Sequence, residues 1–469
     1  MTTTAQREER AKTVRTLAAR IRGDVLGPSD AGYDDARRLH NAMIDKRPRV
    51  IARCVDAADV IEAVRFGHEA GLEVAVRGGG HNGGGLGSVD DGLVIDLSAM
   101  RAVRVDPEAG TVAALGGCRL GDIDHATHAF GQATPSGIVS ATGVGGLTLG
   151  GGLGHLTRKL GLSIDNLLSA DVVLADGTFV RASEKENPDL FWALRGGGGN
   201  FGVVTAFTFR LSPVDTIIGG PTLFPLERSG EILRWYRDFL PNAAWDLNGF
   251  FAFLTVPPAP PFPEHLHLRK MCAIVWCYCG PEDEAGEAFR PVRALQPELD
   301  GVAPMPFPAL QSAFDALLPP GDQWYWRADF VQDISDAAIE AHLRHGPRMP
   351  TWKSTMHLYP VDGAAARVGP GDTAWAYRDA RWAQVIAGID PDPASAPLLK
   401  QWTVDYFDAL HPHSMGGAYV NFMMNEGMDR VRATYRGNYG RLAAVKQAYD
   451  PANYFHLNQN IQPSGGGRG

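Results

Sequence analysis

Cysteine is scarce in this chain of 469 residues, which has only Cys54, Cys118, Cys272, Cys277 and Cys279. An odd and widely spaced set of this kind argues against a disulfide framework. Cys277 and Cys279 lie close together, but their surroundings alternate like a strand, and no His or Cys pair lies nearby in the sequence. A structural zinc ion needs about four ligands, which is two pairs of Cys or His residues. Since the second pair is missing, we expect no metal site.

Basic runs and long apolar runs are also missing. Lys and Arg number 44 against 53 Asp and Glu, which gives a net charge of −9. An acidic chain without basic clusters argues against nucleic-acid partners and against binding to anionic membranes. Residues 1–25 lack the apolar segment of a signal peptide, and no stretch has the composition of a membrane span. We therefore expect a cytoplasmic protein that binds neither nucleic acid nor membrane.

Glycine, by contrast, is abundant, with 55 of the 469 residues, whereas average usage is about 7%. Much of the excess lies in three runs, at 78–87, 143–154 and 196–202. Successive backbone N–H groups in such runs can converge on phosphate oxygens, and the missing Cβ lets a ligand approach closely. Three runs favour a long cofactor with a pyrophosphate, although tight turns and bulges would also explain them.

Two windows fit the dinucleotide pattern GxGxxG, beginning at Gly78 and at Gly197. That pattern indicates a Rossmann site only when a strand precedes it and a helix follows it. The first window leads into further glycines, and the second follows a predicted helix, so both contexts argue against a Rossmann site. The chain has no Walker A sequence, which excludes a P-loop.

The pattern along the chain predicts two domains. Residues 1–45 are charged and predict a solvated helical segment, and residues 47–213 alternate between short strands and helices, as α/β nucleotide-binding domains do. Asp56 is a predicted N-cap and Asp176-Gly177 a predicted hairpin turn. Residues 214–414 predict a second α+β domain. A strand at 416–422 and a helix that ends at Asp450-Pro451 are expected near the C-terminus.

Several segments together resemble one known family. They are RGGGHN (77–82), GVGGLTLGGGLGHLTRKLGLSIDNL (143–167) and YRGNYGRLAAVKQAYDPANYFHLNQNI (435–461). The chain resembles the berberine bridge enzyme-like FAD-linked oxidases of the vanillyl-alcohol oxidase/PCMH flavoprotein superfamily. The resemblance implies an α+β fold with an FAD domain at 1–213, whose PCMH-type core at 47–213 has two α/β subdomains. It also implies a substrate domain at 214–414, whose antiparallel sheet covers the flavin, and a C-terminal segment at 415–469 that returns to the FAD domain.

The resemblance also implies how FAD is held. His81 matches the histidine that bonds covalently to the flavin 8α-methyl group, as a neutral imidazole can. Val139 stands where many members carry a second, cysteinyl tether, so we expect a single tether. The implied cofactor site also contains Arg77, Gly78, Gly79, Gly80, Asn82, Gly83, Pro135, Ser136, Gly137, Thr142, Gly143, Gly145, Gly146, Gly150, Gly151, Gly154, His155, Asn166, Gly199, Gly202, Val204, Asn458 and Asn460.

The family's usual base is missing, because Leu153 and Phe422 stand where many members have tyrosines. His357 is the first candidate for a substitute base and His155 the second, and for both a packing role is at least as plausible. Thr142 matches the position beside flavin C4a that gates oxygen, and it resembles the bacterial polyketide-tailoring oxygenases whose flavin carries an N5-oxide. The expected substrate-lining residues are Leu153, Trp326, His357, Tyr419 and Phe422.

These observations favour an FAD-dependent oxidase. It would take a hydride from an alcohol, a sugar or a secondary metabolite to flavin N5 and pass the electrons to O2, giving H2O2. The first alternative is a flavin-dependent oxygenase with N5-oxide chemistry. The second is a flavin-free binding protein that has kept the fold.

Overall fold

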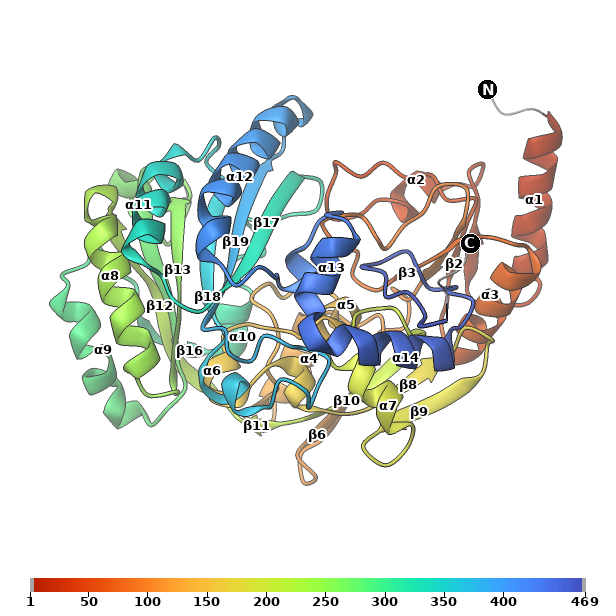
Figure 1. Ribbon diagram of the computed structural model, residues 1–469, viewed down its shortest axis with the longest axis horizontal. Coiled ribbons are helices and arrows are strands. Elements are labelled where there is room, and N and C mark those ends of the chain that lie inside the picture. Colours follow the sequence, from red (N-terminus) through yellow and green to blue (C-terminus); the bar gives the residue numbers. More distant parts are fainter. Residues whose placement is uncertain (1–3, 466–469) are drawn as a thin grey trace.

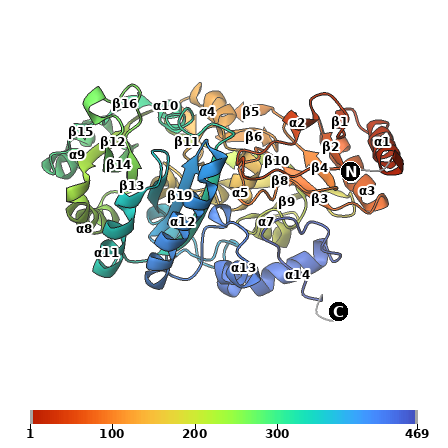
Figure 2. The ribbon, with the colours of Figure 1, turned by 90° about the horizontal axis from the view of Figure 1, so that it is seen from above.

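Helices and strands assemble around three main sheets. The computed structural model describes residues 4–465 (Figure 1). The first two sheets are built from residues before Ser212, and the third, larger sheet from residues after Pro213. Near the C-terminus, α14 (Tyr439–Tyr449) lies on the side of the first two sheets, as the view from above also shows (Figure 2). The combination of sheets and helices confirms the predicted α+β class.

The first sheet is mainly parallel. Its strands are, in spatial order, β1 (Asp24–Leu26), β2 (Val50–Arg53), β4 (Leu93–Asp96) and β3 (Val74–Arg77). The predicted helix is confirmed as α3 (Ala57–Glu69), and the Asp56 side chain accepts a hydrogen bond of 3.0 Å from the backbone N–H of Asp59. This cap pairs one N–H group that the first turn of a helix leaves without a partner. The first glycine run begins directly after β3.

The second sheet is antiparallel. Its strands are, in spatial order, β5 (Val103–Asp106), β6 (Thr111–Leu115), β10 (Val203–Arg210), β8 (Leu167–Val173) and β9 (Phe179–Ser183). The predicted hairpin is confirmed between β8 and β9, where Gly177 has a φ of +79°. The other two glycine runs lie in connections of this sheet. Run 143–154 contains the helix α5 (Val144–Leu149), and run 196–202 links α7 (Pro188–Leu194) to β10.

The third sheet has eight antiparallel strands. In spatial order they are β15 (Leu299–Asp300), β12 (Thr216–Pro225), β14 (Lys270–Tyr278), β13 (Leu247–Thr255), β18 (Thr355–Pro360), β19 (Trp382–Asp390) and β17 (Gln323–Val331), with β16 (Ala303–Pro306) beside β12. One face is covered by the helices α8 (Ser229–Phe239), α9 (Ala285–Ala294), α11 (Asp336–His345) and α12 (Ala396–Leu410) (Figure 1). The other face is turned toward the first two sheets.

Side chains of the third sheet alternate between these two faces, as the period of two in a strand requires. On β18, Met356 and Leu358 are fully buried in the core under the helices. Thr355, His357 and Tyr359 of the same strand lie on the opposite face and line a cavity. A single strand therefore contributes both to the hydrophobic core and to the candidate site.

The prediction of a strand at 416–422 is wrong. The carbonyl oxygen of Gly417 accepts a hydrogen bond from the N–H of Phe330 in β17, and the segment then turns, because the N–H of Phe422 donates to the carbonyl oxygen of Tyr419 at 2.8 Å. The remaining α-helices and strands are α1 (Thr4–Ala18), α2 (Tyr33–Ala36), α4 (Leu120–His128), β7 (Gln132–Ala133), α6 (Thr157–Leu160), β11 (Ser212–Pro213), α10 (Phe307–Gln311) and α13 (Met428–Tyr435). Among residues 4–465, no helix is long and apolar enough to cross a membrane.

The prediction of a solvated segment up to residue 45 also fails in part. His40 and Asn41 are buried, and the Asn41 side-chain amide donates to the carbonyl oxygens of Gly83 and Trp324, at 2.8 and 3.0 Å. The segment therefore joins the first glycine run to β17 of the third sheet. Apolar contact and paired amide groups compensate for its removal from water.

A fully buried ion pair holds the C-terminal segment. The Lys446 ammonium group donates to Asp450 at 2.6 Å and to the carbonyl oxygens of Asn200 and Phe455 at 2.6 and 3.0 Å. The Asp450 carboxylate also accepts the N–H groups of Tyr454 and Phe455. Removing one partner of a buried pair leaves an uncompensated charge, which typically costs about 3–5 kcal/mol.

We expect Asp450→Ala to lower the midpoint of thermal unfolding strongly, because Lys446 would remain buried without its carboxylate. The matched control is Asp189→Ala, which breaks the exposed ion pair between Asp189 and Arg441. Arg441 lies in α14, the helix that also contains Lys446. The control should unfold almost like the wild type. Equal midpoints for the two variants would contradict the role assigned to the buried pair.

Candidate active site

A cavity of about 780 Å³ lies between the third sheet and the first two sheets. The residues that line it come from the glycine runs, from the cavity face of the third sheet and from the C-terminal segment. Its volume falls within the range of about 300–1,000 Å³ that is typical of small-molecule sites. The three glycine runs, at 78–87, 143–154 and 196–202, therefore meet at one site.

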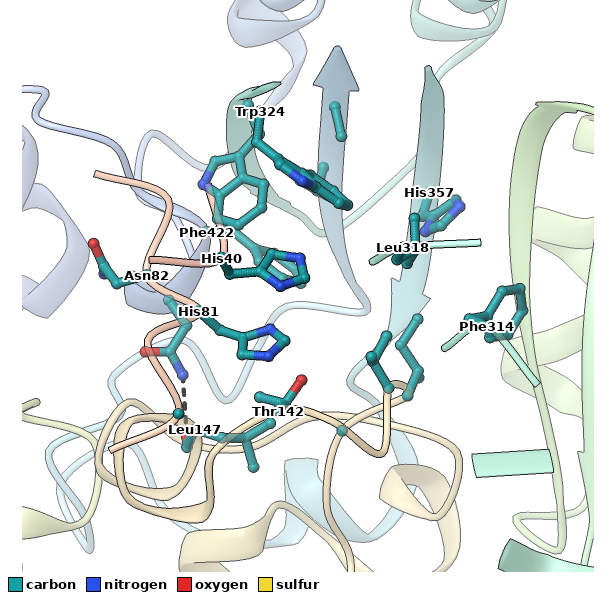
Figure 3. Close-up of a pocket in the computed structure, with 18 of the residues that line it drawn as sticks. His40, His81, Asn82, Thr142, Leu147, Phe314, Leu318, Trp324, His357 and Phe422 are labelled. Atoms are coloured by element: carbon teal, nitrogen blue, oxygen red, sulfur yellow. Dashed lines mark hydrogen bonds between the residues drawn. The ribbon is translucent and has the colours of Figure 1, made fainter. Parts of the chain in front are cut away.

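Two glycine runs cross at this cavity with backbone against backbone. A Cβ atom added to Gly79 would overlap the backbone nitrogen of Gly143, and one added to Gly143 would overlap the backbone nitrogen of Gly79. Neither position tolerates a side chain, so the two segments of the backbone approach more closely than any residue other than glycine allows. The crossing brings His81, two residues after Gly79, near Thr142, which directly precedes Gly143 (Figure 3).

His81 lies in the cavity wall, stacked against His40. The two ring centroids are 4.1 Å apart with an angle of 18° between the planes, and Trp324 packs on the other side of His40 at 5.4 Å (Figure 3). Burial, together with smaller contributions from the neighbouring His40 and Arg119, lowers the pKa of His81 to about 3. Burial also lowers the pKa of His40 to about 4. Both imidazoles are therefore neutral at pH 7.

Across the cavity, three polar side chains of β18 are joined by hydrogen bonds. The Nε2 atom of His357 lies 2.9 Å from the hydroxyl oxygen of Thr355, and its Nδ1 atom is hydrogen-bonded to the hydroxyl of Tyr359. Burial lowers the pKa of His357 to about 3 and raises that of Tyr359 far above its usual value. Neither group carries a charge at pH 7.

The part of the cavity near the third sheet is mostly apolar. Its one charged lining side chain there, Lys353, is paired with Asp322 at 2.6 Å. Among the described residues that line the cavity there is no Asp or Glu. The apolar lining residues in this part are Pro221, Leu223, Leu254, Phe262, Val275, Met305, Leu310, Phe314, Leu317, Leu318, Val385 and Ile389.

Many of the residues predicted from the sequence line this cavity. From the cofactor set they are Arg77, Gly78, Gly79, Gly80, His81, Asn82, Gly137, Val139, Thr142, Gly143, Gly146, Gly199 and Asn458. All five predicted substrate-lining residues do so as well, namely Leu153, Trp326, His357, Tyr419 and Phe422. These residues come from distant parts of the chain, and only the fold brings them together.

The other predicted cofactor residues lie outside the cavity wall. They are Gly83, Pro135, Ser136, Gly145, Gly150, Gly151, Gly154, His155, Asn166, Gly202, Val204 and Asn460. Several of these glycines instead leave room for a neighbouring group, since a Cβ on Gly83 would overlap the Trp326 ring and one on Gly151 would overlap Trp375. The Asn166 amide donates to the carbonyl oxygens of Leu160 and Leu162. For Gly83, Gly151 and Asn166 the structure thus shows packing and local hydrogen bonding.

For His155 the geometry does not support the predicted catalytic role. Its side chain is almost fully buried beside Phe250 and does not line the cavity, and neither ring nitrogen has a hydrogen-bond partner among the described residues. Burial lowers the pKa of His155 to about 3. It packs as a neutral ring, which is the alternative that the sequence left open.

Sequence analysis missed four residues of the site. His40 lies in a segment that was not singled out, and nothing in its local pattern points to the cavity, whereas Trp324 lies two residues before the predicted Trp326. Thr355 and Tyr359 could have been predicted, because each lies two residues from His357 in a predicted strand. Side chains at i and i+2 share one face of a strand, so all three had to point the same way.

Comparison with known proteins places this architecture in a family. A family profile described as "FAD binding domain" matches residues 48–183, and one described as "Berberine and berberine like" matches residues 418–462. An FAD-linked oxidoreductase of Dictyostelium discoideum is 31% identical over 96% of this chain and 97% of its own length. The (R)-6-hydroxynicotine oxidase of Paenarthrobacter nicotinovorans is 41% identical over 95% of this chain and 98% of its own.

The chain belongs to the berberine-like FAD-linked oxidoreductases. The fold of the chain is also similar to that of a solved oxidase. The xylooligosaccharide oxidase of Myceliophthora thermophila superposes with a TM-score of 0.83 over 97% of this chain and 99% of its own, at 23% identity. The resemblance found in the sequence is confirmed, and the protein is an FAD-binding enzyme of the oxidoreductase class.

The residues of this FAD-linked oxidoreductase fit the cofactor. The glycine runs expose bare backbone to the cavity, which suits a pyrophosphate. Several buried polar atoms of the wall have no hydrogen-bond partner among the described residues, and they include the Nη1 atom of Arg77 and the side-chain oxygen of Asn458. The other guanidinium nitrogen of Arg77 donates to Asp96 at 2.7 Å. Unpaired donors and acceptors at a cavity are the groups that a polar cofactor would satisfy.

We expect Gly143→Ala to reduce the FAD content of the purified enzyme, because the new Cβ would force the two glycine runs apart. The measurement is the flavin absorption per mole of protein. The control is Gly286→Ala in α9, where an added Cβ meets no other atom. Full FAD occupancy in Gly143→Ala would show that the crossing does not have to be this close.

Proposed function

We propose that this enzyme is an oxidase that removes two electrons, as a hydride, from a carbon of a small and mostly apolar substrate bearing an O–H or N–H group. The observation that carries the proposal is the continuity of one cavity, which runs from the glycine runs and His81 to the apolar face of the third sheet. FAD, when bound, accepts the hydride, and O2 takes the electrons on to give H2O2. The residues of the chain hold the reactants and manage the proton.

His81 is the proposed attachment point of FAD. Its ring faces the cavity beside Thr142, and its pKa of about 3 leaves the imidazole neutral and able to act as a nucleophile. The stacked ring of His40 restricts the orientation of His81. Val139, which replaces the cysteine of a second tether, lines the same cavity, while Cys54 and Cys118 do not. These observations support a single histidyl tether.

Denaturing the enzyme tests this tether. In the wild type the flavin should stay with the protein, and mass spectrometry should find the adduct on the peptide that contains His81. In His81→Ala all flavin should appear in the supernatant. The control His68→Ala removes a histidine that packs on Tyr454 instead of lining the cavity, and it should retain the adduct. Flavin still attached in His81→Ala would place the bond elsewhere.

The lining favours an apolar substrate over a sugar. An oligosaccharide presents many hydroxyl groups, each of which needs a polar partner when it leaves water. The wall of the third sheet offers chiefly the hydroxyls of Thr255, Thr355 and Tyr359, and otherwise aliphatic and aromatic side chains. Of the two similar enzymes, xylooligosaccharide oxidase is named for a sugar, and (R)-6-hydroxynicotine oxidase is named for a small compound with an aromatic ring. The apolar wall suits the second kind of compound better than the first.

Oxygen consumption with a defined panel tests the substrate class. The panel contains benzyl alcohol, cinnamyl alcohol, N-methylbenzylamine, 6-hydroxynicotine and xylobiose. We expect the aromatic compounds to give higher kcat/KM values than xylobiose, with one H2O2 formed per O2 consumed. Preference for xylobiose would contradict the apolar class, and turnover of none of the compounds would contradict the proposed oxidase.

Thr142 favours one second candidate, a flavin-dependent oxygenase. Its side chain lines the cavity next to His81, at the position that the family resemblance places beside the reacting part of the flavin (Figure 3). A threonine hydroxyl is a polar group that can hydrogen-bond to an oxygen species there. Reaction under labelled O2 separates the two functions, because an oxidase puts all the label into H2O2 and an oxygenase puts one labelled atom into the product.

A further inference from the structure

The three hydrogen bonds on β18 have a single consistent direction. The hydroxyl of Thr355 lies 2.7 Å from the carbonyl oxygen of Phe253, which can only accept, so Thr355 donates its one hydrogen there. The hydrogen in the bond between His357 and Thr355 must then be on Nε2 of His357. A neutral imidazole with hydrogen on Nε2 accepts at Nδ1, so the hydroxyl of Tyr359 donates to Nδ1.

This direction changes which group can meet the substrate. Both nitrogens of His357 are engaged, so the ring has no free position for a substrate proton. The Tyr359 oxygen, by contrast, donates one hydrogen and accepts none from the described residues, which leaves its lone pairs available. Tyr359 also lines the cavity. The oxygen of Tyr359 is thus the acceptor that this strand presents.

We propose that Tyr359 takes the proton from the substrate and that His357 and Thr355 act as positioning residues behind it, in a relay from the substrate to Tyr359 to His357. This proposal rests on the proposed oxidase function. It assigns the base to a tyrosine of the substrate-domain strand, in a chain where the two usual tyrosine positions are Leu153 and Phe422.

The relay balances for an alcohol. The C–H bond breaks and its electron pair leaves with the hydrogen as hydride to FAD, while the O–H proton moves to the Tyr359 oxygen and the carbon–oxygen double bond forms. The hydrogen of Tyr359 moves at the same time to Nδ1 of His357. When O2 is reduced, it takes the hydride equivalent and the proton held by His357, giving H2O2. The relay then returns to its first state.

The surroundings of the relay keep water away from it. Phe250 packs against the rings of both His357 and Tyr359, with centroids 5.1 and 5.0 Å away, and Phe422 lies 5.8 Å from Tyr359. None of these neighbours titrates. Burial holds His357 neutral and Tyr359 protonated, so the hydrogen of Tyr359 has to move together with the substrate proton instead of leaving beforehand. A proton acceptor placed in this way typically contributes about 10²–10⁴-fold to the rate.

Tyr359→Phe is the first test, because it removes only the hydroxyl. We expect kcat for the fastest aromatic compound of the panel to fall by about 10²–10⁴-fold, with little change in KM and unchanged FAD content. The chain offers a matched control in Tyr406, whose hydroxyl lies 2.7 Å from Nδ1 of His342 in a buried pair between α12 and α11. Tyr406→Phe breaks the same kind of bond away from the cavity and should leave kcat unchanged.

A second measurement needs no turnover. In the holoenzyme labelled with ¹⁵N-histidine, NMR should find the hydrogen of His357 on Nε2, and Thr355→Val should remove this preference. A hydrogen on Nδ1 of His357 in the wild type would overturn the relay whatever the activity, as would a Tyr359→Phe enzyme as fast as the wild type. Failure of the proposed function is distinct, since it would appear as an enzyme without flavin or without oxygen consumption on the whole panel.

Discussion

The active site depends on the close crossing of two backbones at Gly79 and Gly143. A side chain on either residue would overlap the main chain of the other, so the geometry is available only to glycine. The two runs belong to different sheets, the first following β3 and the second preceding β8. The crossing therefore fixes one half of the FAD domain against the other at the point where His81 and Thr142 enter the cavity. Other glycines of the runs expose backbone to the cavity, as Gly146 and Gly199 do, or leave room for rings, as Gly83 does for Trp326 and Gly151 for Trp375.

A second constraint is that the cavity contains ionisable groups but almost no charge. His40, His81 and His357 are all buried enough to be neutral at pH 7, and Lys353 is neutralised by Asp322. In a medium of low dielectric constant an unpaired charge would be costly, whereas neutral imidazoles can serve as nucleophiles or as hydrogen-bond acceptors. The same burial that removes charge also excludes water. Both effects suit a reaction in which a hydride and a proton leave the substrate for different partners.

Local patterns in the sequence predicted the parts of the fold that local forces determine. The N-cap of Asp56, the β8–β9 hairpin at Gly177 and the family motifs around His81 depend on backbone preferences over a few residues. The errors have long-range causes. The segment 416–422 alternates like a strand, but contacts with β17 and the cavity bend it at Tyr419. His40 and Asn41 follow a charged helix, yet they are buried by β17, more than 280 residues away.

The register of β18 connects the core to the chemistry. Opposite β18, residues 251–253 of β13 pair with 356–358, so Phe251 and Phe253 lie beside Leu358 and Met356 in the core under the helices. The intervening residues share the cavity face, where the small Ala252 pairs with His357. A shift by one residue would exchange the faces of the strand, burying the imidazole in that core and exposing Met356 and Leu358 to the cavity. The four large apolar side chains thus penalise a shift by one residue, and their packing on one face keeps Thr355, His357 and Tyr359 on the other.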